Sequence, residues 1–146
     1  MSGLVLPQIR ATFRAVAATV VPETAALDAD GWARLEAEVE RALRSRPERM
    51  VRQLVLFARL LEVASLFTDR TRFSRLVPAA RHRVLKSLEL SRLVLLRRGV
   101  WGLRTLVLLG YYTQAEVQAR IGYRAHVDGW SARRTSGEHA ATPTDN

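Results

Sequence analysis

The sequence predicts an all-α protein, a single domain of five or six helices followed by a disordered C-terminal tail. Apolar residues recur at spacings of three and four, which is the helical period, and no stretch alternates as a strand would. Prolines and capping motifs separate these runs. The 146 residues, 48% of them hydrophobic, suffice for one core. We expect the helical domain over 1–130 and the tail over 131–146, where Ser, Thr, Gly, Pro and mixed charges predominate.

The first two helices are predicted by apolar stripes on one face. Pro7 is suited to a first helical turn, and Pro22 ends the stripe that follows it. A polar connector over 24–30 precedes a second stripe, which runs from Trp32 to Leu43. Glu36, Glu38 and Glu40 fall away from this apolar face, where we expect most of them to be exposed.

A third helix is predicted after residues 45–48, which read Ser-Arg-Pro-Glu and match a capping box with proline in the first turn. It runs from about Met50 to Phe67 and is apolar over a wide arc. A wide apolar arc is typical of a helix covered on several sides, so we expect this helix to lie centrally. An arginine-rich connector follows over 68–77.

Pro78 opens the longest helical segment, which continues to about Leu109 and contains Gly99 and Gly102. A glycine inside a helix costs roughly 1 kcal/mol relative to alanine. We therefore expect either a kink at these glycines or close helix packing that leaves no room for a side chain. A second capping box over 113–116 predicts a short helix to about Ile121, with Gly122 as a left-handed cap and a loop after it.

The positive charge of the chain is concentrated in one segment. Residues 1–69 hold nine arginines and nine acids, and residues 105–146 hold four of each, so the net charge of +9 comes from 70–104. There Glu89 is the single acid beside ten cations: Arg70, Arg72, Arg75, Arg81, Arg83, Lys86, Arg92, Arg97, Arg98 and Arg104. Codon bias accounts for the excess of arginine over lysine, but not for the missing acids. The segment predicts contact with a nucleic acid, an anionic lipid surface or an acidic protein.

Residues that would support catalysis are scarce. The absence of cysteine excludes thiolate zinc sites, iron–sulfur clusters, cysteine nucleophiles and disulfides. His82, His126 and His139 are too scattered for a metal site, and the single pair His126 and Asp128 is a weak signal. No glycine-rich phosphate loop or dinucleotide fingerprint occurs. We therefore expect no enzymatic activity, no metal and no cofactor in this chain.

Two alternative functions follow from the basic segment. Residues 113–122 resemble the first helix and turn of a helix-turn-helix, which would suit a basic helical DNA-binding regulator, but 123–130 provide no recognition helix. Leu93–Leu96 and Leu103–Leu109 beside the arginines would suit a peripheral membrane-binding module. No uncharged apolar run reaches the ~18 residues of a membrane span, and no export leader is visible. We expect a cytoplasmic protein with neither nucleic-acid binding nor stable membrane insertion.

A longer pattern points to a partner protein. Residues 73–92 read FSRLVPAARHRVLKSLELSR, residues 103–113 read LRTLVLLGYYT, and residues 121–123 read IGY. In this order they resemble the helical region ahead of the flavin domain in long-chain fatty alcohol oxidases of the glucose-methanol-choline (GMC) oxidoreductase family. Residues 15–23 are similar to the small subunit of gluconate 2-dehydrogenase type enzymes. The flavin-binding fold of that family does not follow in this chain.

The resemblance implies a free-standing, non-catalytic small subunit, which binds and stabilises a separate GMC-type oxidoreductase of alcohols, sugars or sterols. FAD would be held by that large partner subunit in a hetero-oligomer, and no catalytic residue carries over to this chain. Aromatic residues and arginine are also typical of interface centres. The expected partner interface comprises Arg92, Arg97, Arg98, Arg104, Tyr111, Tyr112, Tyr123 and Trp130. The substrate, the electron acceptor, the stoichiometry and any contribution to the active-site entrance stay open.

Overall fold

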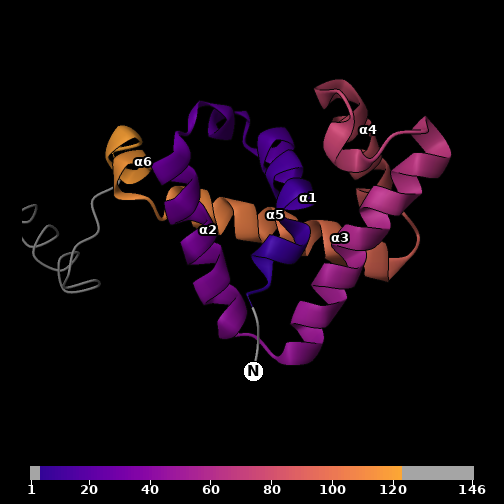
Figure 1. Ribbon diagram of the computed structural model, residues 1–146, viewed down its shortest axis with the longest axis horizontal. Helices are drawn as coiled ribbons and strands as arrows, with labels where there is room; N and C mark the ends of the chain where they lie inside the picture. The colour runs from indigo at the N-terminus through magenta and orange to yellow at the C-terminus, as the bar shows by residue number, and fades with distance from the viewer. Residues whose placement is uncertain (1–3, 123–146) are drawn as a thin grey trace, which may run out of the picture. The chain divides into compact units, whose positions relative to one another are not determined.

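The computed structural model describes residues 4–122, and within them it confirms the all-α class. The elements are α1 (Leu6–Val20), η1 (Pro22–Ala26), α2 (Ala29–Arg44), α3 (Glu48–Asp69), η2 (Phe73–Arg75), α4 (Pro78–Glu89), α5 (Val94–Tyr112) and α6 (Ala115–Arg120), where η marks a 3₁₀ helix (Figure 1). The chain divides into two units after Gln114, so α6 is described by itself. The predicted tail lies outside the described residues.

The core of the first unit is built around α1 and α5. In Figure 1, α1 lies between α2 and α3, and α5 crosses behind them; α1 and α5 each contact α2, α3, α4 and one another. Phe13 of α1, Leu35 of α2, and Leu103 and Val107 of α5 are fully buried. The connector after α3 adds Phe73 of η2, also fully buried. Every helix of this unit thus packs an apolar face against the α1–α5 pair.

The expected central position of the third helix is wrong. Only one side of α3 enters the core, through Phe57, Ala58, Leu61 and Ser65. The opposite side carries large apolar residues that are exposed. The sequence correctly predicts that α3 is apolar over a wide arc, but other described residues cover only part of that arc.

The long segment after Pro78 is two helices, and the break between them is not at a glycine. It falls at residues 90–93, where the Ser91 hydroxyl oxygen accepts a hydrogen bond from the Leu93 N–H at 3.1 Å. Such side-chain bonds compete with helical ones. Helix α5 then runs unbroken through Gly99 and Gly102.

Close packing, one of the two expectations stated, explains Gly99 but not Gly102. A Cβ atom at Gly99 would lie 2.4 Å from the ring of Phe57 in α3. A Cβ at Gly110 would lie 2.8 Å from Cγ2 of Val39 in α2. At Gly102 the nearest atom, a Leu54 methyl, would be at an ordinary 3.4 Å. Glycine therefore allows α5 to approach α3 and α2 at two separate points.

Both predicted capping boxes are wrong, because each hydroxyl bonds to the preceding helix. Ser45 Oγ donates to the Ala42 carbonyl oxygen at 2.8 Å, and α3 begins after Pro47 without a side-chain cap. Thr113 Oγ1 donates to the Leu109 carbonyl oxygen at 2.7 Å, as the C-cap residue of α5. The left-handed conformation of Gly122, with φ of 71°, agrees with the prediction.

The N-terminus of α1 is capped from a distance by Glu40 of α2. Its Oε1 accepts from the Val5 N–H at 2.9 Å, and its Oε2 accepts from the Leu6 N–H at 3.0 Å. Helix N-termini leave such N–H groups unpaired and favour negative charge. Glu40 is buried, so the expected exposure of the carboxylates of this helix does not hold at this position.

Candidate functional site

The exposed side of α5 brings together most of the described residues expected at the partner interface. Arg97, Trp101, Arg104 and Tyr112 are separated by four, three and eight residues, which places them on one side of a helix. Arg98 and Val94 lie on the same side. All six are exposed, and the Trp101 side chain is 70% accessible. We call this surface, comprising Val94, Arg97, Arg98, Trp101, Arg104 and Tyr112, the α5 face.

The first half of the α5 face is hollowed where α4 ends. An open depression of about 490 Å³ is lined by Glu89, Leu90, Val94, Arg97, Arg98, Trp101 and Arg104. Its lining combines the positive ends of three arginines with the apolar surfaces of Leu90, Val94 and Trp101. A surface of this composition can accept an apolar or aromatic side chain together with neighbouring carboxylates.

The electrostatics of the depression are strongly positive. Arg104 Nη1 lies 3.2 Å from Glu89 Oε1, which pairs the one acid of the basic segment. Arg97 and Arg98 have no carboxylate partner within residues 4–122. Two guanidinium groups are therefore left with their hydrogen-bonding capacity directed to solvent, beside an exposed tryptophan.

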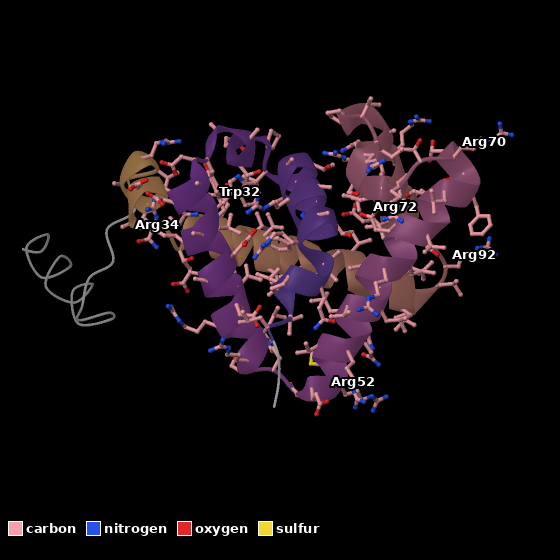
Figure 2. All side chains as sticks on the ribbon, in the orientation of Figure 1. Trp32, Arg34, Arg52, Arg70, Arg72 and Arg92 are labelled. Carbon is pink, nitrogen blue, oxygen red and sulfur yellow. The ribbon has the colours of Figure 1, made fainter. Side chains whose placement is uncertain are left out.

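The remaining predicted interface residues lie elsewhere. Arg92 is exposed on the α4–α5 connection, at the edge of the view in Figure 2. Tyr111 is buried, and its ring meets that of Tyr112 edge to face, with centroids 5.2 Å apart. Tyr111 thus belongs to the core, and its ring packs against that of the exposed Tyr112. Tyr123 and Trp130 lie outside the described residues.

Trp101 is the residue of this surface that the sequence analysis did not single out. It was hidden inside a run of apolar residues that reads as core. The helical spacing of Trp101 to Arg97 and Arg104 places it with the arginines and away from the buried Leu103 and Val107. This spacing is the signal by which it can be found.

Residues 4–122 contain no group of three or more His, Asp or Glu side chains arranged to hold a metal ion. No helix in the same range combines the length and apolar character that crossing a membrane requires.

Comparisons with protein families, with curated proteins and with solved structures found no match to this chain. The relationship to GMC oxidoreductase subunits is therefore still a prediction that comes from the sequence pattern.

Proposed function

We propose that this chain is a non-catalytic helical subunit that binds a separate protein through the α5 face. We further propose that the partner is the FAD-carrying chain of a GMC-type oxidoreductase acting on an alcohol, sugar or sterol. The observation that carries the binding role is the exposure of Trp101 beside two arginines that have no carboxylate partner among the described residues. The identity of the partner comes from the resemblance of residues 73–123 to that family.

The chemistry of the α5 face suits a protein partner in particular. Tryptophan, tyrosine and arginine are the residues most enriched among those that carry binding energy at protein interfaces. Arginine is more weakly hydrated than lysine and binds a carboxylate through two parallel hydrogen bonds. Arg97 and Arg98 would pair with acids of the partner, while Trp101 and Tyr112 would lose their contact with water. In the complex, this chain would stabilise its partner and take no part in the chemistry.

Copurification from the native host tests the proposal. A tagged copy of the full chain should bring down a large subunit, and the complex should show the absorption spectrum of a bound flavin. Trp101→Ala and the double variant Arg97→Glu, Arg98→Glu should each recover much less of that subunit. Arg46→Glu is the control, since Arg46 is an exposed arginine in the α2–α3 connection, outside the α5 face.

Three results would contradict the proposal. A colourless lone chain recovered from its host would remove the flavoprotein partner. Retention of duplex DNA at low salt, lost steeply as salt rises and lost in the Arg97, Arg98 double variant, would favour a DNA-binding regulator. Flotation of the chain with anionic vesicles that depends on Trp101 would favour a peripheral membrane protein.

A further inference from the structure

A second surface, on α3, is apolar and exposed. Leu56, Leu60, Val63 and Phe67 follow one another at intervals of four, three and four residues, which is the spacing of a coiled-coil seam. They are 68%, 49%, 48% and 85% exposed. At 1.5 Å per residue they form a continuous line about 16 Å long. We call these four residues the α3 stripe.

Packing of the chain itself does not account for the α3 stripe. The side of α3 that faces α1, η2 and α5 already holds Phe57, Leu61 and Ser65, which are buried. The stripe occupies the opposite side of the same helix. Within residues 123–146, Tyr123, Val127 and Trp130 stand at intervals of four and three, but Arg134 takes the next position, so this series could match only three of the four stripe residues. An isolated exposed leucine is ordinary, but two leucines, a valine and a phenylalanine in one line are typical of an interaction site.

Arginines surround the α3 stripe at both ends and along one flank. Arg49 continues its line before Leu56, and Arg52 and Arg59 lie beside it. Arg70 follows the last residue of α3 as its C-cap, in a left-handed conformation with φ of 53°. Figure 2 shows Arg52 and Arg70 at opposite ends of α3. The ion pair between Arg52 and Glu48 is long, at 3.9 Å, and both side chains are largely exposed, so it neutralises little.

These charges argue against a second copy of the chain as the occupant. In a parallel pair of α3 helices, Arg49 would face Arg49 and Arg70 would face Arg70 of the other copy. In an antiparallel pair, the flanks that carry Arg52 and Arg59 would face one another. Either arrangement places like charges together in a partly desolvated contact, which is unfavourable.

We propose that the α3 stripe binds an amphipathic α-helix of another protein, one whose apolar residues repeat at three and four and are flanked by Glu or Asp. Its apolar residues would pack between Leu56, Leu60, Val63 and Phe67. Its carboxylates would pair with Arg52 and Arg59 along the flank and with Arg49 and Arg70 at the ends. This surface is separate from the α5 face, and the inference does not depend on the flavoprotein partner.

Synthetic peptides and the full chain provide the test, with fluorescence anisotropy of the labelled peptide as the readout. The probe is a helix of about three heptads with Leu at the seam and Glu at the flanking positions. A peptide with Lys at the flanks and a scrambled peptide of the acidic composition are the comparisons. The acidic seam peptide should bind, whereas the other two should bind at least about tenfold more weakly.

Variants of the chain assign the binding to the α3 stripe. Leu56→Glu and Phe67→Glu should each lower the affinity for the acidic peptide about tenfold or more, because each substitution removes apolar contact and adds charge repulsion. Both side chains are mostly exposed, so circular dichroism should show a folded protein. Leu90→Glu makes the same chemical change at an exposed residue of the α5 depression, and it should leave peptide binding unchanged.

Four results would overturn the inference. Equal binding of the scrambled peptide would mean that charge alone is recognised. Equal loss of affinity in Leu90→Glu would place the site on the α5 face. A homodimer that sediments as such and is lost in Leu56→Glu would make a second copy the occupant. Cosedimentation with phosphatidylserine-containing vesicles that is lost in Phe67→Glu would make a membrane the occupant.

Discussion

The two described tryptophans, Trp32 and Trp101, both lie beside arginines, but they differ in exposure and in the acids around them. Trp32 on α2 (Figure 2) is half-buried. The Arg14 guanidinium lies 4.8 Å from its ring centroid, and Arg14 in turn binds Glu36 at 2.8 Å. Trp101 on α5 lies among arginines as well but is largely exposed. The two sites differ in their carboxylates. Near Trp32, Glu36 binds Arg14 and also Arg10, at 3.1 Å, whereas Arg97 and Arg98 near Trp101 have no carboxylate partner within residues 4–122.

The comparison distinguishes a surface whose charges are paired within the described residues from a surface where some charges are not. On the α1–α2 side, the Arg14 guanidinium contacts both the Trp32 ring and the Glu36 carboxylate. On the α5 face, Arg97 and Arg98 lack carboxylate partners within residues 4–122, and in the same range the α3 stripe lacks an apolar cover. A partner that supplies acids beside apolar groups would complete both surfaces.

Adjacent leucines of α3 offer the largest contrast between a covered and an uncovered side. Leu61 is only 1% exposed, so Leu61→Ala should lower the free energy of unfolding by about 2–5 kcal/mol through lost contact and a residual cavity. Leu60 belongs to the α3 stripe, and Leu60→Ala should cost less than about 1 kcal/mol. Urea denaturation followed by circular dichroism measures both. Similar losses for the two variants would mean that the stripe is packed in solution.

Glu40 and Glu38 compare a buried carboxylate of α2 with a partly exposed one. Glu40→Ala leaves the N–H groups of Val5 and Leu6 without their acceptor, so we expect a loss of about 2–3 kcal/mol. Glu38 forms a surface ion pair with Arg41, so Glu38→Ala should cost less than about 1 kcal/mol. Thermal unfolding ranks the pair, and a Glu40 variant as stable as wild type would contradict the capping role.

Two glycines of α5 test how closely that helix is held against α3. Gly99→Ala places a methyl group against the buried Phe57 ring and should destabilise the protein by about 1–3 kcal/mol. Gly102→Ala meets only ordinary contact with Leu54 and should stabilise it by about 0.5–1 kcal/mol. Opposite signs in chemical denaturation are the expected outcome. A stabilised Gly99 variant would mean that the two helices are farther apart than described.

The smallest expected change in the free energy of unfolding is at Trp101, which we compare with Trp32. Trp101→Ala should change the free energy of unfolding by no more than about 0.5 kcal/mol, because its side chain contributes little to the folded chain. Trp32→Ala should cost about 1–2 kcal/mol through lost packing and the lost cation–π contact. Differential scanning calorimetry of both variants at one salt concentration makes the comparison. A strongly destabilised Trp101 variant would show that this side chain serves the fold.

Helix positions could be predicted because they depend on spacing within a few residues. The capping boxes at Ser45 and Thr113 could not, since the same hydroxyl satisfies either the following N–H group or the preceding carbonyl, and here the preceding helix wins. Nor could the break at 90–93, because Ser91 is a weaker local signal than the glycines.

The site was predictable only in part, because side-chain spacing reports which residues share a face and not whether that face is covered. Arg97, Arg98 and Arg104 followed from the charge count. Trp101 and the α3 stripe have core-like chemistry, and only the packing of the other helices leaves them exposed. The long-range partnership of Glu40 with the start of α1 has no local signature at all.

That partnership also sets an order of events during synthesis. The first turn of α1 leaves the ribosome well before the carboxylate that will hold it, which lies 35 residues farther along the chain. Until then its leading amides have only water, and we expect that turn to fray. Closure of the first turn of α1 must therefore wait until α2 has formed.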